Sequence, residues 1–156
     1  MPDTNGVYIE FYDDEITLQE VSDTEYFEIF DEGFSLNVMA AENVVFSHNG
    51  LLEVLVGSAA YPIVGGTFTI IEVAAMVTDV PTGSAVKVDV NKNDVTIYGT
   101  QNNRPTIAIG ARIAVVGAHS VTSVTDGDYL SVDIDEIGSG SPGSFLTVVI
   151  RLQRVA

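Results

Sequence analysis

The 156-residue sequence contains no cysteine and no tryptophan, and only six of its side chains are Lys or Arg. Without cysteine the chain can form no disulfide, no thiolate metal site and no cysteine nucleophile. The six basic residues face 22 Asp and Glu residues, which gives a formal net charge of −16. Because nucleic-acid binding depends on cations that displace counterions from phosphates, we expect no nucleic-acid partner.

Long apolar runs are also missing. No segment reaches the roughly 20 apolar residues that span a bilayer, and residues 1–30 are acidic where a secretory signal would be basic and then apolar. We therefore expect a soluble chain with no membrane contact and no cleaved leader. The glycine-rich stretches at residues 64–67 and 138–143 have no following lysine and no helix start, so no nucleotide cofactor is predicted.

The charge that is present is distributed unevenly. Residues 1–53 hold thirteen acids and no Lys or Arg, whereas residues 54–156 hold the other nine acids and all six bases. Eight of the thirteen Phe and Tyr residues also lie within residues 1–50. This break predicts an acidic, aromatic-rich N-terminal arm over residues 1–49 and one β-sandwich domain over residues 50–156.

The arm combines two opposing tendencies. Burial of a large apolar side chain contributes roughly 1.5–3 kcal/mol, which favours packing of the aromatic rings. The like charges oppose compaction of the segment on itself, so we expect it to bind a separate surface, either its own domain or a neighbouring subunit. The aromatic residues expected to contact a partner are Tyr8, Phe11, Tyr12, Tyr26, Phe27 and Phe30.

From residue 51 onward the pattern is that of β-structure. Val86, Val88 and Val90 alternate with Lys87 and Asp89, and such alternation is typical of a sheet that is wet on one side. The run at residues 70–77 could pass as a buried helix, but its β-branched residues favour an inner strand. Turn formers at residues 91–94 predict a hairpin. Strands are expected at residues 51–57, 67–78, 85–90, 95–98, 112–116, 129–136 and 145–152.

Nucleophilic catalysis finds little support in the sequence. Only His48 and His119 could act as a base, and no Gly-x-Ser-x-Gly motif occurs. His119 and Ser120 are sequence neighbours, and neighbours in a strand point to opposite faces. We interpret both histidines as surface or cross-strand residues and expect no catalytic site.

Carboxylates are so numerous that a pair of them carries little information. Asp133 and Asp135 share one face of an expected strand, a spacing found in glycosidase sites, but we favour a solvated sheet face. Oxygen ligands for calcium are available without the loop that makes an EF-hand specific, so no metal is expected. The carboxylates considered for calcium are Asp13, Asp14, Asp126 and Asp128.

Several segments carry a family pattern in a fixed order. Residues 81–93 contain a Pro-Thr-Gly turn and a strand that ends in Asn-Lys-Asn, and residues 100–107 contain Asn-Arg-Pro-Thr-Ile. Residues 126–139 contain Gly-Asp-Tyr-Leu-Ser-Val-Asp-Ile-Asp followed by a Gly-Ser loop. Together they resemble a domain that recurs in tailed-bacteriophage virion proteins, over about residues 50–154. The chain departs from this pattern at Asp94-Val95, where the family usually has Gly-Thr.

The resemblance implies an all-β, jelly-roll-like antiparallel β-sandwich, usually a homotrimer, as found in tail fibres, baseplate-associated proteins, head fibres and capsid decoration proteins. Arg104 precedes the rigid Pro105 in a polar loop. Two interpretations of Arg104 stay open: an ion pair with a neighbouring subunit, or a surface arginine that packs its stem.

The expected function is that of a virion structural protein, specifically a capsid decoration (cement) protein that binds the major capsid protein or other virion subunits. It would be located in the virion after assembly in the host cytoplasm, and it would be neither an enzyme nor a cofactor-binding protein. The alternative is a head-fibre or tail-fibre protein that recognises a host surface glycan through the loops at residues 91–94 and 102–105.

Overall fold

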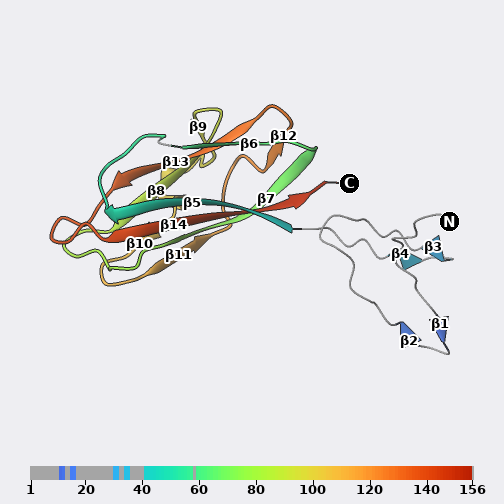
Figure 1. Cartoon of the computed structure of the whole chain (residues 1–156), viewed down its shortest axis with the longest axis horizontal. Helices are drawn as coiled ribbons and strands as arrows, with labels where there is room; N and C mark the ends of the chain where they lie inside the picture. The colour runs from blue at the N-terminus through green and yellow to red at the C-terminus, as the bar shows by residue number, and fades with distance from the viewer. Residues whose placement is uncertain are drawn as a thin grey trace, which may run out of the picture. The chain divides into compact units, whose positions relative to one another are not determined.

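The computed structural model describes residues 11–12, 15–16, 30–31, 34–35, 41–57 and 59–155. The chain divides into two compact units, Met1–Ala40 and Ala41–Ala156. In the first unit, β1 (Phe11–Tyr12) pairs with β2 (Glu15–Ile16), and β3 (Phe30–Asp31) pairs with β4 (Phe34–Ser35), both antiparallel. These two short ladders are labelled in Figure 1.

The second unit consists of two antiparallel sheets (Figure 1). The first, which we call the β8–β13 sheet, has the order β10-β8-β13-β6, and β9 also pairs with β8. The second, the β7–β14 sheet, has the order β11-β7-β14-β5, and β12 also pairs with β7. The bounds are β5 (Ala41–Leu51), β6 (Ala60–Pro62), β7 (Thr67–Met76), β8 (Val86–Lys92), β9 (Val95–Thr96), β10 (Thr106–Ile107), β11 (Ile113–Val116), β12 (Ser123–Thr125), β13 (Tyr129–Glu136) and β14 (Ser144–Arg154).

The connectivity makes this sandwich jelly-roll-like, because the chain repeatedly crosses from one sheet to the other. It changes sheet between β5 and β6, β6 and β7, β7 and β8, β10 and β11, β12 and β13, and β13 and β14. Among the described residues the helical structure is limited to the 3-10 turn η1 (Gln101–Asn103). No helix in that part of the chain is long and apolar enough to cross a membrane. The predicted all-β antiparallel sandwich is confirmed.

The core lies between the two sheets, and the long strands each contribute alternate residues to it, as the period of two requires. The predicted alternation in β8, β13 and β14 is therefore confirmed, and residues 70–77 form part of β7 rather than a helix. The buried inner-face residues are Val86, Val88, Val90, Leu130, Val132 and Ile134 of the β8–β13 sheet and Val44, Val73, Ala75, Leu146, Val148 and Ile150 of the β7–β14 sheet.

The outer face of the β8–β13 sheet differs from its prediction. The sequence predicts a solvated face, whereas Asp89, Asn91 and Ser131 are only 7%, 7% and 4% exposed. The prediction is wrong at the centre of this face because loops distant in the sequence cover it, as the bonds of Gly57 and Arg104 to its carboxylates show. Alternation within one strand cannot reveal such a cover.

The start of the sandwich also differs from the expected position. The second unit begins at Ala41, so the boundary inferred at residues 49–50 falls inside β5. The strand predicted at residues 51–57 is wrong, because residues 52–54 lie outside any strand and Leu55 forms only an isolated bridge with Ile134. β5 contains one acid, Glu42, and no Lys or Arg, so counting charges groups this strand with the arm.

Candidate functional site

Three carboxylates gather on the outer face of the β8–β13 sheet. Asp89 of β8 lies directly opposite Asp133 of β13, and Asp135 follows two residues further along β13. Like charges that face each other on neighbouring strands destabilise a sheet. This cluster therefore depends on hydrogen-bond donors and a cation brought in from elsewhere in the chain.

Arg104 supplies the cation. Its Nη1 donates a hydrogen bond to Asp135 Oδ2 and lies 3.8 Å from Asp89 Oδ2, while its Nε donates to the Gln101 carbonyl at 3.0 Å. Pro105 favours the extended backbone seen at Arg104, with φ −64° and ψ 146°. The Arg104 side chain is 16% exposed, and its guanidinium is paired within its own chain. Its predicted contact with another subunit stays a prediction.

Donors from three further segments complete the cluster. Both oxygens of Asp133 are bonded: Oδ1 accepts from the Gly57 backbone N–H at 2.6 Å, and Oδ2 accepts from Asn91 Nδ2 at 2.8 Å. Thr96 Oγ1 donates to Asp89 Oδ1 at 2.7 Å. The carboxylates thus fasten the loop at residues 52–57 and the segment at residues 96–104 onto the sheet. In this arrangement Asp133 and Asp135, the pair whose spacing resembles that of glycosidase sites, are engaged by internal donors.

Burial dominates the electrostatics of this cluster. It raises the pKa of Asp89; the Thr96 hydrogen bond and the Arg104 charge act against this shift, and the Asp135 charge adds to it. Burial, together with the charge of Asp89, also raises the pKa of Tyr98. The Tyr98 side chain is fully buried, and its hydroxyl has no hydrogen-bond partner among the described residues.

A second polar cluster forms where the β8–β9 hairpin meets the start of β13. Lys92 Nζ lies 2.8 Å from Asp128 Oδ2, and Asn93 Nδ2 donates to Asp128 Oδ1 at 2.7 Å. Lys92, the Thr125 backbone N–H and Asn93 lower the pKa of Asp128 to about 2. Asp128, one of the four carboxylates considered for calcium, is therefore already paired with an ammonium group.

Of the other carboxylates considered for calcium, Asp126 is the one that lies among the described residues. Asp126 accepts a hydrogen bond from the Gly66 backbone N–H at 3.1 Å, and Asp13 and Asp14 lie outside the described residues. Within the part of the chain that the structure describes, no group of three or more His, Cys, Asp or Glu side chains is placed to hold a metal ion.

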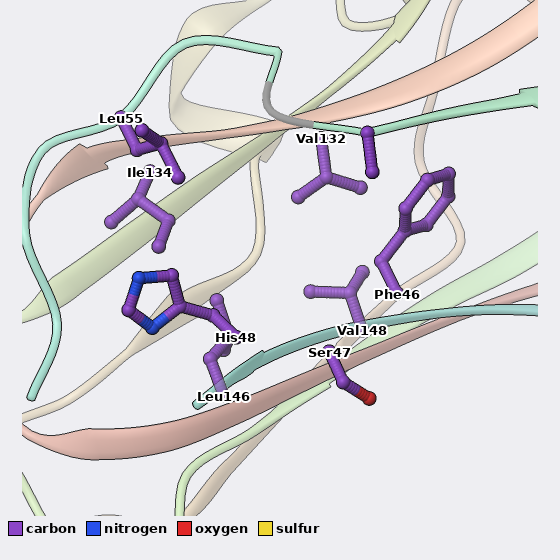
Figure 2. Close-up of a pocket in the computed structure, with 9 residues that line it drawn as sticks. Phe46, Ser47, His48, Leu55, Val132, Ile134, Leu146 and Val148 are labelled. Atoms are coloured by element: carbon purple, nitrogen blue, oxygen red, sulfur yellow. The ribbon is translucent and has the colours of Figure 1, made fainter. Parts of the chain in front are cut away.

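Among the described residues, neither histidine is bonded to these carboxylate clusters. His119 Nε2 donates to the Ile70 carbonyl at 2.8 Å, whereas Ser120 Oγ accepts from the Gly99 backbone N–H at 2.9 Å. His119 and Ser120 therefore bond to different segments and not to each other. The ring of His48, in β5, points into a small cavity between the sheets (Figure 2).

This cavity has a volume of about 40 Å³, which is room for water but far below the roughly 300–1,000 Å³ of a small-molecule pocket. The His48 ring lies near Ile134 and Leu146, while the Ser47 hydroxyl points away (Figure 2). His48 Nδ1 has no hydrogen-bond partner among the described residues. The lining residues are Phe46, Ser47, His48, Leu55, Ala59, Val132, Ile134, Leu146 and Val148.

The predicted contact residues of the arm are described only in part. Phe11 and Tyr12 form β1, and Phe30 begins β3, so their backbones are placed in short strands. Tyr8, Tyr26 and Phe27 lie outside the described residues. The prediction that these aromatic side chains bind a partner remains untested.

Comparison with known proteins gives a structural likeness but no sequence match. No protein-family model matches the chain, and no curated protein sequence matches it. Among solved structures, a chain described as "Cyanophage Pam1 capsid asymmetric unit" aligns with a TM-score of 0.47 and 11% sequence identity, over 88% of this chain and 98% of that chain. A TM-score below 0.5 at this identity establishes neither a common fold nor a common function.

Proposed function

We propose that this chain is a structural protein of a tailed-bacteriophage virion, and that it acts there as a capsid decoration protein. It would bind the major capsid protein or other virion subunits as a homotrimer and would stabilise the shell through protein contacts alone. Its place would be the virion, after assembly in the host cytoplasm.

One observation carries this proposal. The segments that resemble the phage virion domain, residues 81–93, 100–107 and 126–139, contain β8, β10 and β13, which are neighbours in one sheet. The Arg of the Asn-Arg-Pro-Thr-Ile segment bonds to a carboxylate of the Val-Asp-Ile-Asp strand, through Arg104 and Asp135. The motif residues thus form one connected unit, which gives a physical reason for their joint occurrence.

The polar groups of this unit support a scaffolding role. The Asp89, Asp133 and Asp135 carboxylates are all engaged by donors of the same chain, so they hold loops in place. We propose accordingly that the chain catalyses no reaction. The unaltered chain should then hydrolyse no glycan, and the double variant D133N/D135N should behave in the same way. Glycan hydrolysis by the unaltered chain that is lost in D133N/D135N would refute this.

The N-terminal arm would attach the chain to the capsid. Its aromatic residues would supply the buried anchors that dominate protein interfaces, and its acidic residues would steer it to a positively charged seam between capsid subunits. Such a division separates a rigid body from an adhesive segment. Decoration proteins need both, because they add to a shell that has already formed.

Cryo-electron microscopy of the virion that carries this chain tests the proposal. We expect density for the sandwich on the capsid shell at threefold-related positions. Density confined to the tail would refute the decoration role. A second experiment adds purified protein to capsid shells that lack it. The triple variant Y8A/F11A/Y12A should bind more weakly than the unaltered chain, whereas V95A, which alters an exposed valine of the sandwich, should bind equally well.

The head-fibre or tail-fibre alternative has less support. It would use the loops at residues 91–94 and 102–105, where Asn93 and Arg104 are engaged by Asp128 and Asp135 of the same chain. Binding of the purified chain to a host glycan array, abolished by N102A or N93A, would favour this alternative over decoration.

A further inference from the structure

The middle of the outer face of the β7–β14 sheet is apolar. Cross-strand pairing aligns Val115 of β11, Ala74 of β7, Val149 of β14 and Val45 of β5 in one row across all four strands. All four side chains of this row are aliphatic. Val115 and Val45, at its two ends, are 54% and 56% exposed.

The rows on either side mix apolar and polar side chains, since Thr147 and Ser47 end one row and Asn43 ends the other. In one of them, Ile113 lies beside Met76, and Met76 lies beside Thr147; Ile113 and Met76 are 57% and 47% exposed. In the other, Glu72 of β7 lies beside Arg151 of β14, with 3.5 Å between Glu72 Oε1 and Arg151 Nη1. We call the three rows together the apolar face.

The apolar face carries no net charge, whereas residues 41–156 as a whole carry −5 and residues 1–40 carry −11. Its one acid, Glu72, lies next to its one base, Arg151, and the remaining members of the three rows are uncharged. Two copies of this chain, each with a net negative charge, repel each other. A neutral apolar surface is where that repulsion is smallest and where burial is most favourable.

We propose that the apolar face binds the same face of a second copy of this chain. A twofold axis that runs parallel to the strands, between β7 and β14, brings the two faces together. This axis sets β7 of one copy against β14 of the other, and β11 against β5. Each aliphatic row then meets the aliphatic row of the other copy, Val115 against Val45 and Ala74 against Val149.

The charges fit the same axis. It places Glu72 of one copy opposite Arg151 of the other, and Arg151 opposite Glu72, so each charge acquires a second partner of opposite sign. An interface with twofold symmetry requires a surface that is complementary to itself in this way.

The size of the face sets the expected strength. Four strands about 4.8 Å apart and three rows about 6.8 Å apart give roughly 400 Å² per copy, below the about 800 Å² per partner of a standard stable interface. We therefore expect weak association of the isolated protein, in the micromolar-to-millimolar range, that is reinforced where copies are held close together. The contact is independent of the homotrimer of the proposed function, because a threefold axis cannot use it.

Charge-swapped variants of the full chain, measured by sedimentation equilibrium up to millimolar concentration, test the inference. R151E leaves two acids on each face, and E72R leaves two bases, so each variant alone should self-associate at least about tenfold more weakly than the unaltered chain. An equimolar mixture of R151E and E72R should recover the association, because acids then face bases. Only a contact between copies can be restored by mixing.

Two further variants complete the experiment. V115D places a charge in the aliphatic row and should weaken association both alone and in any mixture. K87E makes the same charge change as R151E at an exposed pair of the β8–β13 sheet, Lys87 with Glu136, and should associate like the unaltered chain. Loss of the contact should lower the mass, to that of the trimer if the threefold contact exists and from dimer to monomer if it does not. Equal masses for all variants, or a mixture no heavier than its separate components, would overturn the inference.

Discussion

At the scale of single residues, the structure shows one guanidinium serving two carboxylates. Arg104 bonds to Asp135 and lies 3.8 Å from Asp89, and Asp89 is only 7% exposed. Removing the cation would leave two acids near each other in a place that water reaches poorly. Removing Arg104 should therefore lower the free energy of unfolding by more than the loss of an exposed ion pair would, because the two remaining carboxylates keep their desolvation penalty.

We predict that R104Q lowers the free energy of unfolding by about 1–3 kcal/mol, as measured by urea unfolding at pH 7. The double variant R104Q/D135N should recover part of this loss, since it removes one of the two acids that Arg104 neutralises. R112Q is the matched control, because Arg112 is exposed and no ion pair is found for it among the described residues. If R104Q proved as stable as R112Q, the network would be incidental to the fold.

Asp128 provides a prediction with a defined pH range. Its pKa falls from 3.8 to about 2 in the folded chain, chiefly through Lys92. A depressed pKa means that the ionised carboxylate favours the folded state, so its stabilisation is present above pH 3.8 and is lost as the pH falls through about 2. The stability difference between the unaltered chain and D128N should therefore be largest at pH 5–7 and should shrink towards pH 2.

Urea unfolding of both proteins at a series of pH values measures this difference directly. The other acids titrate in both proteins, so their contributions cancel in the comparison. E53Q is a suitable control, because Glu53 is exposed in a segment outside the strands and should give a small difference at every pH. A D128N difference that stayed constant from pH 7 to pH 2 would contradict the assigned ion pair.

At the scale of elements, turn chemistry was readable from the sequence, whereas three short edge strands were not. The hairpin predicted at residues 91–94 is confirmed: β8 pairs with β9, and Asn93 and Asp94 have φ values of 51° and 65°. Two positive φ values are those of the type I′ turn that matches strand twist. In contrast, β6, β10 and β12 have only two or three residues each, too few for any period to be seen.

Strand β14 contains a positive φ value that its sequence does not predict. Phe145, near the start of β14, has a φ of +52°, at the point where the pairing of β14 with β5 shifts register. A bulky residue in the left-handed region costs roughly 1–2 kcal/mol. This residue is 49% exposed, so burial of its side chain offsets little of that cost.

We predict that F145G is more stable than F145A by about 1 kcal/mol, because both variants lose the ring and only glycine adopts a positive φ without steric cost. Thermal unfolding of the two variants at one pH measures the difference. The analogous pair at Val149, V149G and V149A, provides the control: Val149 lies within regular pairing, so alanine should be the more stable there. Alanine more stable than glycine at both positions would contradict the bulge geometry.

At the scale of the whole molecule, the sequence predicted the fold class well and the site poorly. Val-rich alternation identified β8, β13 and β14 because each has one face in the core. The same alternation suggested that Asp89 and Asp133 were solvated, since it carries no information on loops that return from residues 57 and 104. Arg104 was singled out by the family resemblance, but its partners were fixed only by the folding of β10 and β13 onto β8.

The division of the chain is the feature on which charge and structure disagree most clearly. Acid counts place the boundary at residues 49–50, whereas β5 starts at Ala41 and pairs with β14 up to Leu51. Removal of residues 1–49 would therefore strip most of an edge strand, including the buried Val44. It would also uncover the hydrogen-bonding edge of β14, a central strand of its sheet.

We predict that a fragment of residues 41–156 unfolds cooperatively with a midpoint close to that of the full chain, because its core and both sheets are complete. A fragment of residues 50–156 should be less stable by several kcal/mol or should aggregate, since the loss of buried side chains and an exposed β14 edge act together. Circular dichroism melts and sedimentation velocity on both fragments make the comparison. If the shorter fragment were as stable and monomeric as the longer one, β5 would be dispensable and the boundary inferred from charge would be the physical one.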